Sequence, residues 1–161
     1  MEVSTLLIKE LPPYPNARLP VLVYAQAEPD KPDFASLFRR NGFEGIWTNG
    51  IYSFHHFHAT AHEALGCISG WAQILLGGPE GTLINVRKGD ALLLPAGVAH
   101  KLVKASDDFR IVGAYPPGQS PDLQRGEGDI TRIKQSISKL PLPRTDPVTG
   151  TQGAVHTHWH N

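Results

Sequence analysis

The sequence contains a single cysteine, Cys67, and it has no long apolar run and no excess of one charge sign. One cysteine excludes an intrachain disulfide and a zinc site built from several thiolates. No apolar stretch approaches the roughly 20 residues that span a bilayer, and Leu6-Leu7-Ile8 is too short for a signal-peptide core. Fifteen basic side chains balance fifteen acidic ones, so no net field attracts nucleic acid or an anionic membrane. These absences predict a cytoplasmic protein that binds neither nucleic acid nor membranes.

The composition that is present predicts one all-β domain over residues 1–161, since 40% of the 161 residues are hydrophobic and 16 Gly and 14 Pro punctuate short runs. Strands separated by such turns are typical of a sandwich or barrel. We expect strands over 19–25, 46–57, 62–68, 71–76, 82–86, 91–94, 100–103 and 109–115. Two short helices are expected, over 32–41 and, after an N-cap at Asp129, over 130–140. The tail, 142–161, is expected to lie extended on the surface.

Eight histidines fall in three places along the chain: His55, His56, His58 and His62, then His100, then His156, His158 and His160. In a strand, residues two apart face the same way, so His56 and His58 can bind one ion from one side. Glu63, after a short turn, and His100, in a different hairpin, can reach the same point. Three imidazoles and a carboxylate suit one divalent transition metal ion, such as Fe, Mn, Ni, Co, Zn or Cu. His62 is an alternative ligand that replaces or joins Glu63, because the register after the turn is open.

Two motifs carry a family resemblance. Gly50, His56, His58, Glu63 and Gly70 follow the pattern G-x5-HxH-x4-E-x6-G, and Gly89, Pro95, Gly97 and His100 follow G-x5-PxG-x2-H. With these spacings the chain resembles the cupin superfamily over about residues 45–115, and Lys104 stands where the second cupin motif usually ends in Asn. The flanking segments Asn49-Gly50-Ile51-Tyr52, His62-Glu63-Ala64-Leu65-Gly66 and Asp146-Pro147-Val148 look most like the YjlB-type bacterial cupins.

The resemblance implies a double-stranded β-helix, or jelly-roll barrel, with a few short peripheral helices. It also implies a metal bound inside the barrel mouth by His56, His58, Glu63 and His100. Segments 1–44 and 116–161 are expected to pack around this barrel. Cupins of this size often pair as dimers, so we expect a homodimer.

Several other side chains allow two interpretations. Lys104 shares the strand face of His100 and could orient an anionic substrate or donate a proton, or it is a solvated lysine at a strand end. His55 faces away from His56 by strand parity, and Cys67 is expected to be a small buried core residue. Tyr52, Phe54 and Trp47 either line a pocket or pack in the barrel. The C-terminal histidines, on a strand, could form a second metal site; incidental affinity for nickel or zinc is the plainer interpretation.

An ion held by three His and one Glu leaves positions for a small-molecule ligand. The hypothesis is therefore a metal-dependent enzyme acting on a small organic molecule, with an Fe(II)-type dioxygenase as its first form and Lys104 as a candidate catalytic residue. A Lewis-acid isomerase or lyase is the alternative within the enzymes. The alternative from a different class is a non-catalytic cupin that binds a small ligand.

Overall fold

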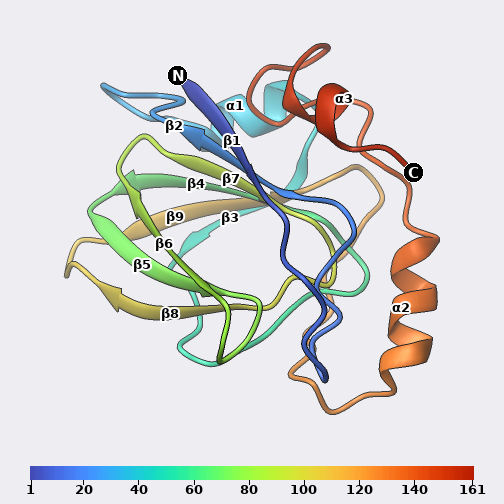
Figure 1. Ribbon diagram of the computed structural model, residues 1–161. Helices are drawn as coiled ribbons and strands as arrows, with labels where there is room; N and C mark the ends of the chain where they lie inside the picture. Colours follow the sequence, from blue (N-terminus) through green and yellow to red (C-terminus); the bar gives the residue numbers. More distant parts are fainter.

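A computed structural model describes all residues, 1–161, and shows two antiparallel β-sheets that face one another (Figure 1). The larger sheet has six strands, in the order β1 (Glu2–Leu6), β2 (Val21–Ala25), β7 (Ala91–Leu94), β4 (Glu63–Ser69), β9 (Arg110–Tyr115) and β3 (Glu44–Asn49). The smaller sheet has three, in the order β6 (Thr82–Arg87), β5 (Trp71–Leu76) and β8 (His100–Ala105). The protein is therefore of the all-β class with a few short helices, as the sequence predicted.

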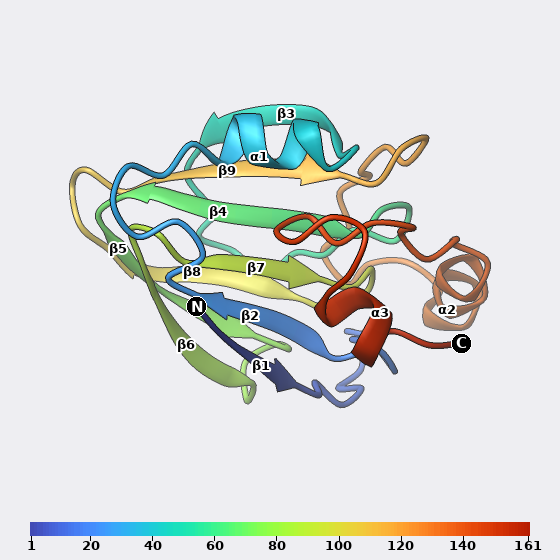
Figure 2. The same cartoon turned by 90° about the horizontal axis from the view of Figure 1, so that it is seen from above.

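The central strands of the larger sheet, β7, β4 and β9, bury side chains on both faces. Side chains of strand β4 alternate between these faces. Leu65 and Cys67 belong to the core between the two sheets, whereas Ala64 belongs to a second core on the outer face. That outer core lies beneath helix α1 (Phe34–Arg40) and helix α3 (Ala154–His158) (Figure 2). Glu63, two residues before Leu65, therefore points toward the space between the sheets, at one end of the barrel.

The helices follow local signals. In α1 the Asp33 side chain accepts a hydrogen bond from the Ser36 N–H, and the helix buries Phe34, Leu37 and Phe38. Helix α2 (Ile130–Ser138) begins after Asp129, as predicted, but none of its residues is fully buried. No helix of the chain combines the length and the apolar character needed to cross a membrane.

Three expectations about secondary structure were wrong. The strand expected over 46–57 ends at Asn49, so His56 and His58 lie in the connection between β3 and β4. The tail is not extended throughout, because Ala154–His158 forms α3 and Ala154, Val155 and Trp159 are buried. Strand β1 was not expected; it is exposed on both faces and is defined by its pairing with β2 rather than by apolar alternation.

The Cys67 thiol is buried, with 1% of the residue exposed, which confirms the expected core position. Burial raises its pKa to about 11, so the reactive thiolate is a minor species at neutral pH and increases only as the pH rises toward that value. We expect the native protein to react with a thiol reagent at least about 100-fold more slowly than the urea-unfolded chain. An Ellman titration with and without urea measures this ratio. Equal rates in the two states would contradict the inert core position.

Candidate metal centre

A backbone bridge joins the two segments that carry the motif histidines. The His56 N–H donates to the His100 carbonyl at 3.2 Å, and the His100 N–H donates to the His56 carbonyl at 2.8 Å. The bridge holds the connection after β3 against the first residue of β8. The imidazoles of His56, His58 and His100 each offer a nitrogen, and these atoms all lie within 4.8 Å of one another. Three histidines predicted from spacing are thus close enough to share one ion.

Each of the three imidazoles is oriented by a hydrogen bond from its Nδ1 atom to a backbone carbonyl. The Nδ1 atoms of His56, His58 and His100 lie 2.9, 2.5 and 3.0 Å from the carbonyl oxygens of Phe54, Asp122 and Val98. A carbonyl oxygen can only accept, so each Nδ1 carries the proton of the neutral ring. The free Nε2 lone pairs are left to bind a cation, which is the arrangement found around metal-ligating histidines.

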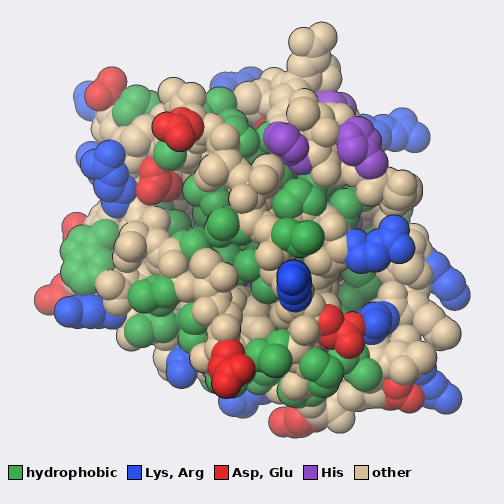
Figure 3. All heavy atoms as spheres, viewed as in Figure 1, with side chains coloured by type: hydrophobic (Ala, Val, Ile, Leu, Met, Phe, Trp, Pro, Cys, Tyr) green, Lys and Arg blue, Asp and Glu red, His purple; other side chains and the backbone are tan.

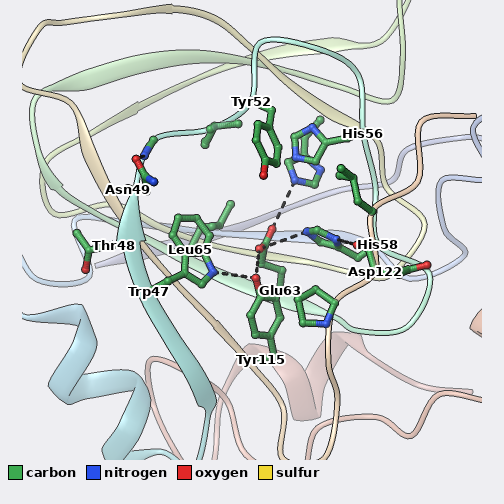
Figure 4. Close-up of a pocket in the computed structure, with 15 residues that line it drawn as sticks. Trp47, Thr48, Asn49, Tyr52, His56, His58, Glu63, Leu65, Tyr115 and Asp122 are labelled. Atoms are coloured by element: carbon green, nitrogen blue, oxygen red, sulfur yellow. Dashed lines mark hydrogen bonds and ion pairs between the residues drawn. The ribbon is translucent and has the colours of Figure 1, made fainter.

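The Glu63 carboxylate lies against two of these Nε2 atoms (Figure 4). Its Oε2 is 3.4 Å from His58 Nε2 and its Oε1 is 3.4 Å from His100 Nε2. The residue is 3% exposed. Lone pairs of neutral imidazoles and a carboxylate repel one another unless a proton or a metal cation lies between them. The donor set therefore fits a divalent transition metal, which satisfies three nitrogens and a carboxylate oxygen together.

The close approach of Glu63 to the histidines also shifts the pKa values of these groups. Burial acts to raise the pKa of Glu63, but hydrogen bonds and charge interactions with His100 and His58 outweigh it and hold the pKa below its usual range. Burial acts to lower the pKa of His58, but the Glu63 carboxylate outweighs it and raises that pKa. Burial, with the neighbouring His100, lowers the pKa of His56 to about 3. A negative charge is thus retained at the centre of the site at neutral pH.

Glu63 is held in turn by Tyr115, the last residue of β9. The Tyr115 hydroxyl donates to Glu63 Oε2 at 2.9 Å and accepts from Trp47 Nε1 at 2.7 Å. Trp47 can reach this position because Gly113, its partner in the β3–β9 ladder, has no side chain; a Cβ atom there would lie 2.1 Å from the indole ring. Burial and the nearby Glu63 charge raise the pKa of Tyr115, so the phenol remains a donor.

Replacement of Tyr115 by Phe removes this donor and leaves the carboxylate free to rotate. Changes in residues that orient metal ligands commonly weaken metal binding by 10–100-fold. We expect the Tyr115→Phe variant to bind Fe(II) or Mn(II) about 10-fold more weakly than the wild type in a competition titration with a chromophoric chelator. Tyr52→Phe is the control, because Tyr52 lines the same cavity but makes no hydrogen bond to Glu63. Equal affinities for all three proteins would show that Tyr115 does not position the carboxylate.

Asp122 fixes the segment that carries His58. Its carboxylate accepts hydrogen bonds from the Ala59 N–H at 2.7 Å and from the Thr60 N–H and hydroxyl at 3.2 and 3.1 Å. Burial acts to raise its pKa, but the donors, Gln124 first among them, lower it, so the group stays ionised. Asp122 therefore orients His58 twice, through its own carbonyl oxygen and through the turn that follows the histidine.

The centre lies in a cavity of about 550 Å³ that opens at the barrel mouth. Trp47, Leu65 and Tyr115 form part of the wall, and Tyr52 and Leu123, each at least half exposed, lie at the rim. Asn49 supplies a neutral polar group, whereas the side chain of Thr48, the preceding residue of β3, points away from the cluster (Figure 4). No lysine or arginine lines the cavity. The volume is within the range of small-molecule sites.

The remaining candidate residues lie outside this cavity. Lys104 is exposed on β8, with its Nζ 5.9 Å from the centre of the Trp71 ring, and it does not line the cavity. His55 packs 5.6 Å from Tyr14, ring centre to ring centre. Phe54 stacks on Tyr52, behind the rim, with 4.8 Å between ring centres. The structure thus gives neither Lys104 nor His55 a contact with the three-histidine cluster.

His62 and the C-terminal histidines are also separate from the cluster. The His62 Nδ1 accepts a hydrogen bond from the Ala96 N–H at 2.9 Å, and its ring packs against Trp159. His156, His158 and His160 lie on or just after α3 and are exposed, where Figure 3 shows histidines on the surface. The second metal site considered for a strand is not formed, because His156 and His158 lie on α3, His160 lies beyond it, and the three do not gather as a group of possible ligands.

Sequence reasoning missed Tyr115 and Asp122 as parts of the site, and it left open whether Trp47 lines a pocket, which it does. Tyr115 is placed beside Glu63 by the β4–β9 ladder, in which Ala64 pairs with Ala114. Tyr115 and Glu63 are 52 residues apart in the chain, and neither cupin motif includes Tyr115. The turn formers around 116–121 were the one available signal, since they mark a loop that can return to the barrel mouth.

Two facing antiparallel sheets, with a histidine triad and a glutamate supplied by two motif segments at the barrel mouth, define a cupin. A relative in Bacillus subtilis (strain 168), the uncharacterized protein YjlB, is 33% identical over 150 residues, which cover 92% of this chain and 90% of that protein. The chain therefore belongs to the YjlB family of cupin-type proteins. No family model matches the sequence.

Similar solved structures include enzymes of different activities. An acireductone dioxygenase from Bacillus anthracis, with a cadmium ion in its active centre, is 17% identical over 55% of this chain and 61% of that chain, with a TM-score of 0.39. The TDP-fucose-3,4-ketoisomerase WlaRA from Campylobacter jejuni is 14% identical over 83% of this chain and 93% of that chain, with a TM-score of 0.43. Likeness at this level carries no information about the substrate.

Proposed function

We propose that the protein is a metal-dependent enzyme that acts on a small uncharged organic molecule, as an Fe(II)-type dioxygenase. The observation that carries the proposal is the set of three imidazoles whose Nδ1–H groups are bound to carbonyls, so that their Nε2 atoms are free beside the buried Glu63. When bound there, Fe(II) would supply the redox chemistry that lets O₂ react with an organic substrate. A dioxygenase places both oxygen atoms in the product, so it consumes no external reductant.

The lining of the cavity supports an uncharged substrate. Organic acids and phosphates are usually bound by arginine or lysine, and neither residue lines this cavity. Glu63 and Asp122 contribute negative charge, which disfavours an anion further. A neutral molecule with adjacent oxygen atoms, such as an enediol or a hydroxyketone, fits a site with neutral donors and an aromatic wall.

The chain's own residues have separate tasks in this proposal. Tyr115 and Asp122 hold Glu63 and His58 in place, as their hydrogen bonds indicate. Asn49 offers a hydrogen bond to the substrate from one wall. Tyr52 and Leu123 at the rim would cover the substrate and exclude bulk water.

The test is metal analysis of untagged protein purified without chelators, followed by oxygen-uptake assays of anaerobically reconstituted Fe(II) protein. We expect about one iron per chain and oxygen uptake with neutral enediols or hydroxyketones, but not with the corresponding acids. A variant with His156, His158 and His160 changed to Gln serves as a control against metal bound at the surface. Zinc as the resident ion, or no oxygen uptake with any neutral substrate, would eliminate the dioxygenase proposal. If zinc is the resident ion, the remaining hypothesis is a Lewis-acid enzyme.

A further inference from the structure

A second cavity of about 390 Å³ lies on the side of the barrel beneath α2, and we call it the helix cavity. Three segments bound it: α2, the N-terminal segment around residues 15–19 and the end of the chain. These segments lie together at one side of the molecule (Figure 1). The helix cavity shares no lining residue with the metal cavity. It is therefore a separate compartment, of a size that holds a small molecule.

One wall of the helix cavity contains a buried hydrogen-bond donor without an acceptor. The His62 Nδ1 accepts from the Ala96 N–H, so the ring proton of the neutral imidazole is on Nε2. Nε2 is buried and has no hydrogen-bond partner, and His62 as a whole is 2% exposed. The Pro141 carbonyl is close enough to affect the ring but does not complete a hydrogen bond. A buried donor of this kind costs about 1–3 kcal/mol unless a partner arrives.

The rest of the lining is mixed: six of its fifteen residues are hydrophobic, and the polar ones include Asn16, Ser138, His160 and the C-terminal Asn161. Ile137, on α2, and Leu140, just after it, line the cavity together with Leu19 and Leu142, and no residue of α2 is fully buried, so apolar surface of this segment is left partly uncovered. Lys134 is paired with Glu10 at 2.6 Å. Arg18, which also lines the cavity, forms no ion pair and is exposed.

We propose that the helix cavity is a second binding site, for a small aliphatic acid that carries an additional carbonyl or hydroxyl oxygen. The aliphatic body lies among Leu19, Ile137 and Leu142, and the additional oxygen accepts the proton of His62 Nε2. The carboxylate lies toward Arg18, the cation without a partner. The ligand thus completes a hydrogen bond and an ion pair that the protein leaves open.

The proposal is tested by calorimetric and NMR titration of the metal-free, full-length protein with three probes. Levulinate has the acid and the additional oxygen, valerate lacks the additional oxygen, and methyl propyl ketone lacks the acid. We expect levulinate to bind about 10-fold more tightly than either of the other two, with chemical-shift changes at the His62 ring and along α2. Binding that shifts residues of the metal cavity instead, or no saturable binding of any probe, would overturn the site.

Matched variants separate the parts of the proposal. Ile137→Trp fills the cavity and should weaken levulinate binding at least about 10-fold, whereas Gln135→Trp, on the exposed side of the same helix, should leave it unchanged. Arg18→Gln should abolish the advantage of levulinate over the ketone. His58→Ala should bind levulinate like the wild type, because the helix cavity is independent of the metal ligands. Retained affinity in Ile137→Trp, or an unchanged preference in Arg18→Gln, would contradict the assignment.

Discussion

The His58→Ala variant is expected to retain less than about one-tenth of the metal bound by the wild type while keeping its fold. The change removes one of three nitrogens and leaves the Glu63 carboxylate with a single imidazole neighbour, His100. Loss of a ligand weakens binding more than the 10–100-fold typical of changes around ligands. The fold should persist because neither His56 nor His58 belongs to either hydrophobic core. Elemental analysis and circular dichroism, measured on the same preparation, check both parts.

The double variant His56→Ala, His58→Ala should lose the metal completely and remain a folded barrel. His55→Ala is the matched control, since it removes a neighbouring imidazole that lies against Tyr14 rather than in the cluster. The control should bind metal like the wild type. Full metal occupancy in the double variant would show that the ion is bound elsewhere, and loss of metal in His55→Ala would show that the effect is not specific to the cluster.

The second large effect is expected at Asp146, whose carboxylate is fully buried and joins the C-terminal segment to the barrel. It accepts hydrogen bonds from the Tyr24 hydroxyl at 2.8 Å and from the N–H groups of Val148, Thr149 and Val155 at 2.8, 3.1 and 3.1 Å. Asp146→Ala leaves all four donors without this acceptor. Because a buried donor without a partner costs about 1–3 kcal/mol, we expect the free energy of unfolding to fall by about 3–5 kcal/mol.

Urea unfolding measures this loss, and hydrogen exchange shows where it acts. Protection should fall most at Val155 and across α3, which the carboxylate fixes to the outer face of the larger sheet. Tyr24→Phe, which removes one of the four donors, is the matched control and should cost about 1 kcal/mol. An Asp146→Ala protein as stable as Tyr24→Phe would mean that the segment is held by apolar packing alone.

The sequence predicted the parts of this protein that depend on local pattern. Strands punctuated by glycine and proline, the helix after Asp129 and the spacing of His56, His58 and His100 are all local signals, and each was confirmed in position or proximity. The reasoning for the histidines was only partly right. They face one another because His56 bridges to His100 after the chain has left β3, not because they alternate on a strand.

The parts that could not be predicted depend on contacts between distant segments. Tyr115 meets Glu63 because β9 pairs with β4, and Asp122 meets His58 because a loop after β9 returns to the barrel mouth. Helix α3 was missed because its short apolar stretch is defined by packing on the outer core, where Val155 and Trp159 are buried. Propensity within five residues is too weak a signal to predict such a helix.

The bridge between His56 and His100 also bears on how a metal ion would bind at the candidate centre. Two backbone hydrogen bonds and three carbonyl-bound imidazoles arrange the donor atoms before any ion arrives, so little of the binding energy is spent on ordering the chain. Such a preorganised set of nitrogen and carboxylate donors binds divalent ions in the order of their intrinsic affinities, so copper and zinc bind more tightly than iron and manganese. Under the proposed function, loading with iron therefore depends on which ions the cell keeps free, and expression in a medium rich in copper or zinc should yield protein loaded with those ions instead.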